Sequence, residues 1–147
     1  MAKRPRVRLL PGWSDCSREN PIGPPTFLRV ASDEPGPLQV SMAEHADGEV
    51  PDPSSEELES MARDSGGEMG LGDVVETASG DCAIGTYGTA VFHADGAPRV
   101  QLWYLTDGRE LVMVTHICPG DPDPDEIAEA DQIVRRITLA KPWWKFW

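Results

Sequence analysis

The stretch Leu111-Val-Met-Val-Thr-His-Ile-Cys118 decides which fold this sequence predicts. Apolar and β-branched residues fill almost every position, which is typical of a strand that is covered on both faces. Successive side chains of a strand point to opposite sides. One face would carry Leu111, Met113, Thr115 and Ile117, and the other Val112, Val114 and His116. We therefore expect this strand to lie in the middle of a sheet.

Three further strands precede it and complete an antiparallel meander. We expect them over residues 74–78, 82–93 and 100–105, with turns at 79–81, 94–97 and 106–109. The last turn contains Asp107-Gly108, and Asp-Gly between two apolar runs is the strongest short-range hairpin signal.

A helix follows the central strand. Asp123 is its predicted N-cap, Pro124 suits the first helical position, and an apolar stripe then recurs at helical spacing. That stripe consists of Ile127, Ala130, Ile133, Val134 and Ile137. The alternation of Asp121, Asp123 and Asp125 resembles a calcium loop. However, Glu126 and Gln132 occupy the positions where such a loop needs Gly and Glu, so we interpret Asp123, Asp125 and Glu126 as capping and dipole-compensating residues.

The first half of the chain predicts a hairpin and a helix. Strands are expected over residues 26–31 and 38–44, joined by a turn that contains Pro35-Gly36. Ser54 and Glu57 have the spacing of a capping box, and the helix that they begin should end at Ser65-Gly66-Gly67. Residues 66–72 would then connect this helix to the meander. We expect one domain, 1–147, with an extended segment 1–25 that has a short strand at 7–10, and an aromatic tail 141–147.

The order of these elements predicts an α+β fold in which two helices flank an antiparallel meander. Gly12-Trp13 after a basic segment, the early hairpin, the meander that ends in Glu110–Cys118 and the closing helix with Ile133-Val-Arg-Arg-Ile137 resemble the PsbP-like superfamily. This superfamily includes extrinsic photosystem subunits, Mog-type Ran-binding proteins and Eag-type chaperones of type VI secretion. The resemblance implies an α/β/α sandwich that serves as a non-catalytic, protein-binding scaffold.

Composition excludes several classes of protein. The chain has 13 Lys and Arg against 25 Asp and Glu, a net charge of −12, which argues against nucleic acid as its partner. No apolar run is long enough for stable membrane insertion. The basic start lacks the apolar run of a secretion signal, and the three cysteines are odd in number, so we expect a cytoplasmic protein without a disulfide framework.

No spacing of residues predicts a catalytic or metal site. The histidines His45, His93 and His116 form no His-Glu-x-x-His motif, and no Cys-x-x-Cys is present, so no metal or cofactor is expected. A thiol site around Cys82, His93 and His116 is the enzyme alternative. Because His116 shares a strand face with Val112 and Val114, we interpret it instead as a core histidine whose hydrogen bonds are satisfied.

The strongest candidate for a binding surface is acidic. Residues 31–81 contain 14 acidic residues and one basic residue, Arg63. The candidates for binding a basic protein partner are Asp52, Glu56, Glu57 and Glu59. The alternative is a solvated face that keeps the protein in solution.

The aromatic tail is the second candidate. Trp143, Trp144 and Trp147, with Phe146, are too apolar to stay exposed, so we expect them to pack on the protein itself, in the same chain or across a homodimer. The alternatives are a membrane interface and a partner that recognises the tail.

These features favour a non-enzymatic cytosolic protein-binding module that uses an acidic surface. An adaptor, a secretion chaperone and a toxin-neutralising immunity protein of a bacterium all fit this description. The alternatives are an enzyme with the thiol site named above and a structural subunit of a homo-oligomer.

Overall fold

The computed structural model describes residues 4–19, 22–43 and 53–140, which contain two α-helices, one short 3-10 helix and nine strands. In chain order these elements are β1 (Arg4–Arg6), β2 (Trp13–Asp15), η1 (Ser17–Glu19), β3 (Thr26–Arg29), β4 (Leu38–Ala43), α1 (Ser55–Glu68), β5 (Val74–Cys82), β6 (Gly85–Ala94), β7 (Ala97–Thr106), β8 (Leu111–Cys118), α2 (Pro124–Arg135) and β9 (Thr138–Ala140). Neither α-helix in these ranges is long and apolar enough to cross a membrane.

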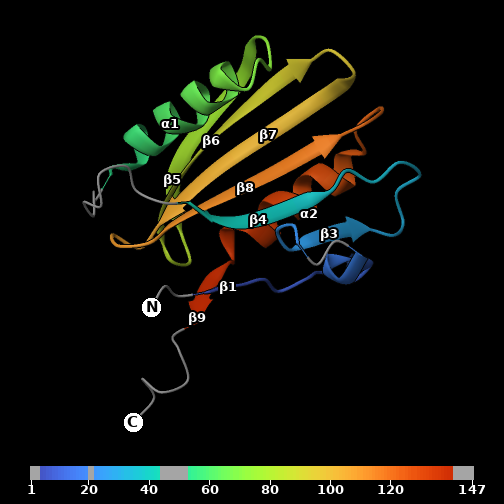
Figure 1. The fold of residues 1–147 in the computed structure, drawn as a ribbon, viewed down its shortest axis with the longest axis horizontal. Helices are drawn as coiled ribbons and strands as arrows, with labels where there is room; N and C mark the ends of the chain where they lie inside the picture. The colour runs from blue at the N-terminus through green and yellow to red at the C-terminus, as the bar shows by residue number, and fades with distance from the viewer. Residues whose placement is uncertain (1–3, 20–21, 44–52, 141–147) are drawn as a thin grey trace.

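Seven of the strands form one antiparallel sheet in the order β2-β3-β4-β8-β7-β6-β5 (Figure 1). The strand β8, which the sequence places at the centre, is the middle strand of the seven. The predicted hairpin is present as β3 and β4, and the meander as β5 to β8. β2 and β5 are the two edges of the sheet.

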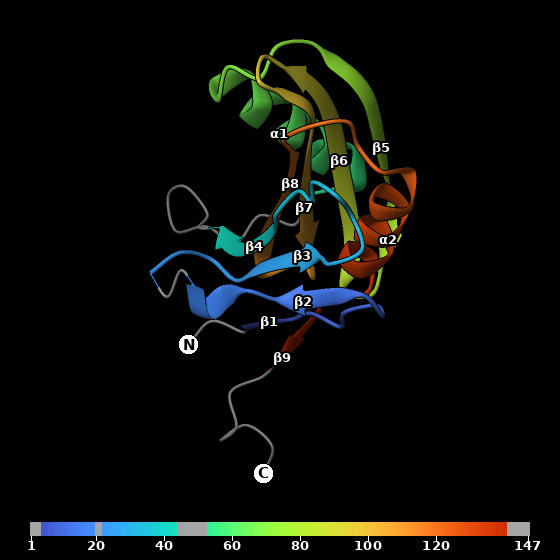
Figure 2. The same cartoon turned by 90° about the vertical axis from the view of Figure 1, so that its right-hand side faces the viewer.

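The two α-helices cover opposite faces of this sheet, as the sequence predicts (Figure 2). On the α1 face, Leu58 and Ala62 pack with Phe92, Leu102 and other apolar residues of β6 to β8. On the α2 face, Ile133 and Val134 belong to a core that also includes Trp103. The arrangement is therefore an α/β/α sandwich.

Helix α1 begins where the sequence predicts and ends later. Both capping-box bonds are present: Glu57 N donates to Ser54 Oγ, and Ser54 N donates to Glu57 Oε1. The predicted stop at residues 65–67 is wrong, because the helix continues to Glu68. Gly66 is buried in the helix, where a Cβ atom would overlap the ring of Phe92. This glycine therefore allows close packing against the sheet rather than ending the helix.

The turn between the first two strands of the meander also differs from the prediction. Ser79-Gly80-Asp81 was expected to form it, but these residues lie inside β5, and the turn is at residues 83–84. Gly80 pairs with Tyr87, and a Cβ atom on Gly80 would touch the Tyr87 ring at 3.5 Å. The glycine is therefore suited to a position in the strand beside an aromatic ring.

The ends of the described chain form a second, two-stranded sheet. β1 pairs antiparallel with β9, with Arg4 opposite Ala140. The short strand predicted at residues 7–10 is wrong. Val7, Leu9 and Leu10 instead pack their side chains against the core of the α2 face.

Candidate functional site

The α2 face of the sheet changes from apolar to polar along β7 and β8. Trp103 faces Val114 in the centre of the core, and the next pair on this face toward the start of β7 is Gln101 opposite His116. Arg99 opposite Cys118 follows. Four polar or titratable side chains thus lie together at one end of this face.

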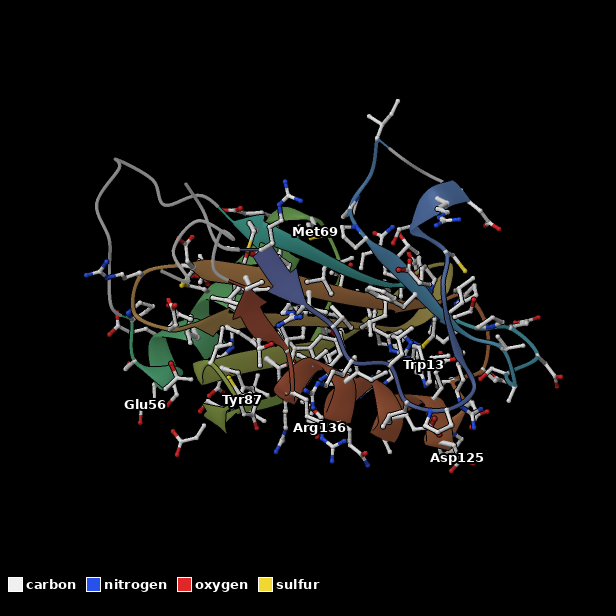
Figure 3. All side chains as sticks on the ribbon, turned by 90° about the horizontal axis from the view of Figure 1, so that it is seen from below. Trp13, Glu56, Met69, Tyr87, Asp125 and Arg136 are labelled. Carbon is white, nitrogen blue, oxygen red and sulfur yellow. The ribbon has the colours of Figure 1, made fainter. Side chains whose placement is uncertain are left out.

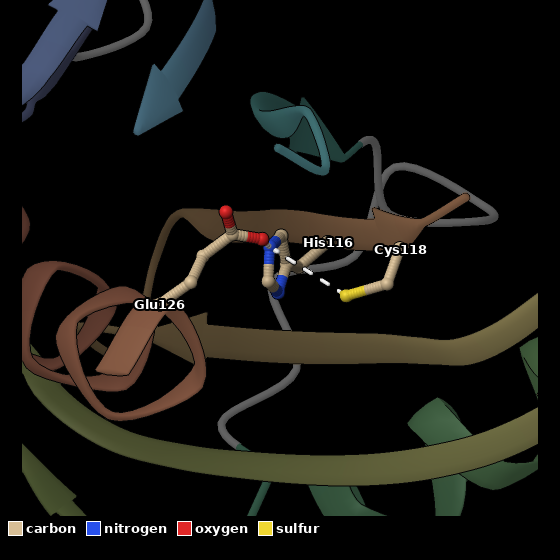
Figure 4. A group of neighbouring side chains, drawn as sticks. All are labelled: His116, Cys118 and Glu126. Carbon is tan, nitrogen blue, oxygen red and sulfur yellow. Dashed lines mark hydrogen bonds and ion pairs between the residues drawn. The ribbon is translucent and has the colours of Figure 1, made fainter. Parts of the chain in front are cut away.

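His116 is fully buried and is hydrogen-bonded to Glu126 from the first turn of α2 (Figure 4). Its Nε2 lies 2.8 Å from Glu126 Oε2, which also accepts a hydrogen bond of 3.1 Å from the Gly36 amide. Burial alone would raise the pKa of Glu126, but the bonds from His116, Gly36 and Ser32 together hold it below its usual value. The carboxylate is therefore ionised, and the pair joins β8, α2 and the loop before β4.

This pair bears on two interpretations of the sequence. His116 is a core histidine whose Nε2 has a polar partner, as expected, whereas its Nδ1 has none among the described residues. Glu126 is interpreted from the sequence as a capping and dipole-compensating residue, and it does lie in the first turn of α2, but its side chain is also buried beneath the helix. The missed signal is its spacing: Glu126 precedes Ala130 by four residues and Ile133 by seven, which places it on the apolar stripe.

Cys118 completes a buried cluster of three ligand-type side chains. Its Sγ lies 4.0 Å from His116 Nε2, and one ligand atom each of His116, Cys118 and Glu126 lies within 4.8 Å of the other two. Burial, followed by the charge of Glu126, raises the pKa of the Cys118 thiol, so the thiol is protonated and weakly nucleophilic. A metal ion there would have to displace that proton and the existing bonds of Glu126. The expected lack of a metal site stays a prediction.

A second polar network ties the start of α2 to the edge of the sheet near β2. Arg29 on β3 donates to Asp123 Oδ2 at 2.9 Å and lies 3.3 Å from Glu129 Oε2. Trp13 on β2 donates its indole N–H to Glu129 Oε1 at 3.1 Å. Asp123 also caps the helix by accepting from the Asp125 amide. Asp123 is thus the predicted N-cap and an ion-pair partner as well.

A groove lies beside Arg99 and Gln101, between α2 and strands β5 to β7. Its volume is about 250 Å³. Strands supply Glu76, Thr89, Arg99 and Gln101 to its lining, and α2 supplies Asp131 and others. A row of hydrogen bonds crosses its floor, from Arg99 through Gln101 to Thr89. The groove thus combines a half-buried cation with fixed neutral polar groups.

The outer edge of the sheet beyond this groove is strand β5. It has nine residues, whereas the opposite edge strand, β2, has three. Of the five large hydrophobic side chains that are exposed in the described parts of the chain, three lie just before or at the start of β5: Met69, Val74 and Val75. This edge therefore presents both unpaired backbone and apolar side chains.

The predicted acidic residues lie on α1, on the opposite face of the sheet from the groove. Glu56 and Glu57 are exposed, and Glu59 is partly exposed. Figure 3 shows Glu56 and Asp125 toward opposite ends of the molecule. Glu57 is occupied by the capping box, and Glu59 lies 3.6 Å from Arg63. Asp52, Trp143, Trp144 and Trp147 lie outside the described residues.

The proposed thiol site does not come together. Cys82 pairs with Gly85 at one end of the β5–β6 hairpin, whereas His93 follows Phe92 at the other end, roughly 26 Å away at about 3.3 Å per residue. His116 lies on β8, which β7 and β6 separate from β5. Burial also raises the pKa of the Cys82 thiol. This version of the enzyme alternative is therefore wrong on geometry.

Comparison with solved structures finds a protein of similar architecture. No protein-family model matches the sequence, and no curated protein matches it significantly. The structure is similar to that of cyanobacterial PsbP (CyanoP) from Synechocystis sp. PCC 6803, with a TM-score of 0.54, 10% identity, and 95% of this chain and 94% of that chain covered. A structure from Bacteroides thetaiotaomicron VPI-5482 gives a TM-score of 0.49 at 15% identity, with 96% of this chain and 50% of that chain covered. The likeness to CyanoP concerns the fold alone: the chain has the PsbP-like fold, with two helices packed on a seven-stranded antiparallel sheet.

Proposed function

We propose that this protein is a non-catalytic binding module that takes up an extended segment of a partner protein as an additional strand along β5. The proposal rests on the edge strand β5, which is nine residues long and has exposed apolar side chains at its start. Strand addition supplies main-chain hydrogen bonds along the added segment, and side-chain contacts then give specificity.

The exposed side chains at the start of β5 support a docking surface at this edge. Val75 is 61% exposed and Met69 51% exposed. A bulge between Val74 and Glu76 breaks the regular pairing of β5 with β6 there. Bulges and charges are common ways to protect an edge from uncontrolled pairing, so a partner must fit this irregular edge specifically.

Charge favours a partner segment with basic residues rather than a second copy of this chain. Asp73, Glu76 and Asp81 are exposed on or next to β5, and the whole chain carries a net charge of −12. Two copies paired through β5 would bring these carboxylates toward each other, and like charges on paired strands are destabilising. A basic segment would be attracted to the same carboxylates and to those of the neighbouring helix α1.

The buried side chains support a binding role over a catalytic one. Glu126 is engaged by two N–H donors, and both Cys82 and Cys118 have a raised thiol pKa. None of these groups combines the exposure and the perturbed pKa that a nucleophile or general base requires.

Selection of peptides tests the proposal. A phage-displayed library of random peptides is selected on the full-length protein, and enriched peptides are synthesised. We expect them to be net positive and to slow hydrogen exchange of alternate β5 amides, measured by NMR. Val75→Asp should weaken their binding about tenfold, since an apolar contact is replaced by a charge.

Val30→Asp is the matched control, because Val30 is 70% exposed and lies next to β3, far from β5 in the strand order. This variant should bind as the natural protein does. Enriched peptides that leave β5 unprotected, or that bind Val75→Asp equally well, would contradict strand addition. Protection of β5 without peptide that grows with protein concentration would instead indicate a homodimer.

A further inference from the structure

We propose that the groove between α2 and strands β5 to β7 is a binding site for a small zwitterion of amino-acid size, whose carboxylate pairs with Arg99. This site shares Glu76 with the β5 edge, but it does not depend on the strand addition proposed above. Its volume of about 250 Å³ is below the range of drug-sized pockets, which is roughly 300–1,000 Å³, and suits a ligand of few atoms.

Arg99 is a cation that forms no ion pair with any of the described residues. It is half-buried in the groove wall, and no Asp or Glu of the described chain lies within ion-pair distance of it. Within residues 4–19, 22–43 and 53–140, its side chain makes one hydrogen bond, from Nη1 to Gln101 Oε1 at 2.9 Å. A guanidinium has five N–H donors, so four remain for a ligand. Burial lowers the pKa of Arg99, which means that the charged form lacks part of the stabilisation it would have in water.

The groups behind Arg99 hold it in place before a ligand arrives. Thr89 Oγ1 donates to the Leu102 carbonyl at 2.7 Å and accepts from Gln101 Nε2 at 3.0 Å. Gln101 and Thr89 are almost fully buried, 6% and 4% exposed. Their side chains thus form a fixed row that leads to the guanidinium, and an oriented guanidinium binds a carboxylate in a planar, two-bond geometry.

The other charges of the groove favour a zwitterion over a simple anion. Asp131 is paired with Arg135 at 3.0 Å, which itself lies over the Tyr87 ring at 4.8 Å. Glu76 is exposed at the β5 side of the groove and could accept an ammonium group. A simple anion would meet the field of a chain with net charge −12, whereas a zwitterion brings its carboxylate to Arg99 without net charge.

NMR titration with free L-amino acids tests the site. Each amino acid is added singly, to about 10 mM, to the ¹⁵N-labelled full-length protein, a range that detects weak binding. We expect at least one to shift the Arg99 side-chain resonance and the amides of Thr89 and Gln101. For that amino acid, the carboxamide form should bind at least tenfold more weakly, because the ion pair to Arg99 is lost. The N-acetyl form should also bind more weakly.

Variants separate the role of Arg99 from a general effect of charge. Arg99→Gln should abolish the shifts. Arg99→Lys should retain part of the affinity, because lysine keeps the positive charge but lacks the planar guanidinium that bonds a carboxylate twice. Arg63→Gln removes an exposed arginine on α1 and should leave the chemical-shift changes and the affinity as they are.

Several results would contradict the proposed site. It is wrong if no amino acid shifts these resonances, or if the carboxamide or the Arg99→Gln variant binds equally well. Equal binding by the N-acetyl form would overturn the zwitterion in favour of a plain carboxylate. Thermal melting shows whether each variant is folded. If Arg99→Gln does not fold, the affinity of Arg99→Lys tests the role of Arg99 in its place.

Discussion

The two faces of the sheet are built on different principles. The α1 face is almost wholly apolar, and its helix approaches the strands through glycines. The α2 face has an equally apolar centre but ends in a buried polar patch, where His116 and Glu126 lie. Because burying charged groups costs free energy unless they are paired, the polar end contributes position and specificity more than stability. The comparison indicates that α1 stabilises the sheet, whereas α2 both stabilises it and forms one wall of a groove.

Close packing on the α1 face depends on two glycines. Gly66 of the helix lies against the ring of Phe92. Gly88 of β6 lies beneath the helix, where a Cβ atom would overlap the backbone of Leu58 and Glu59. Neither position accepts a side chain without moving the helix away from the sheet. On the α2 face, by contrast, the start of the helix is fixed by hydrogen bonds and ion pairs.

The largest expected effect comes from placing a charge in the apolar centre of the α2 face. Val114 is fully buried between Val40 and Trp103 on neighbouring strands. Val114→Asp should abolish cooperative folding, because an unpaired buried carboxylate costs several kcal/mol and the domain has about 5–15 kcal/mol in total. Circular dichroism melting measures this. An unchanged melting temperature would show that β8 is not central to the core.

Breaking the buried contact between His116 and Glu126 should have the next largest effect. Glu126→Ala leaves His116 and the Gly36 amide without an acceptor, so we expect a loss of about 3–5 kcal/mol in the free energy of unfolding at pH 7. Asp125→Ala is the control, because Asp125 is exposed in the same helical turn. It should cost less than about 1 kcal/mol. Urea unfolding compares the two, and equal losses would mean that the pair contributes nothing specific.

The same pair should make stability depend on pH in the acid range. The folded pKa of Glu126 is lowered from its ordinary value of about 4.5, so its contribution is fully present above that pH and is lost as the pH falls through the folded pKa. The difference in unfolding free energy between the natural protein and Glu126→Gln should therefore shrink as the pH falls from about 4.5 to 3. A difference that stays constant down to pH 3 would contradict an ionised Glu126.

The comparison of the two faces also marks what the sequence could predict. The apolar period of β8 placed it in the centre and assigned its two faces correctly, because packing on both sides leaves a direct pattern in the residues. The start of α2 was predicted from Asp123 and Pro124 for the same reason: capping is local. Arg99, Gln101 and Cys118 were missed as members of a polar cluster. Their proximity depends on the pairing register of β7 with β8, which cannot be predicted from the residues of one strand alone.

The main errors in the predicted fold concern two glycines. Gly66 and Gly80 were interpreted as a helix stop and a turn, but both lie inside regular elements beside an aromatic ring, Phe92 and Tyr87. A glycine that permits a left-handed backbone and one that makes room for a ring look the same in a sequence.

Neighbouring glycines of α1 sharpen the contrast between tight and open packing. Gly66→Ala should destabilise the protein by about 1–3 kcal/mol, because the added methyl overlaps the Phe92 ring in a packed core. At Gly67, nothing lies within 4 Å of an added Cβ. Gly67→Ala should therefore stabilise the helix by roughly 0.5–1 kcal/mol, through the lower entropy of the unfolded chain. Chemical denaturation of the two variants measures the difference. Similar values of the same sign would show that α1 is not packed as closely as described.

The smallest expected effect on stability concerns the exposed carboxylates of α1, whose consequence should be kinetic. Among the predicted candidates, Glu57 also closes the capping box and Glu59 pairs with Arg63, so their reversal would mix binding with helix stability. Glu56, Asp64 and Glu68 are exposed and give a cleaner triple reversal to Lys. Its free energy of unfolding should change by no more than about 1 kcal/mol, mainly through the charge at the helix start.

If a basic segment adds to β5 as proposed, this triple variant should slow association of the selected peptides several-fold and leave dissociation nearly unchanged. Charges near an interface act mainly by steering the encounter. The effect should decrease as salt rises, because exposed charges are screened over about 8–10 Å near physiological ionic strength. The matched control reverses three exposed carboxylates elsewhere, Glu19, Asp33 and Asp121, for the same change in net charge. Stopped-flow fluorescence at several salt concentrations measures the rates. If both triple variants slow association equally, net charge alone acts and the α1 surface has no special part in binding; if neither does, the acidic surface is solvation only.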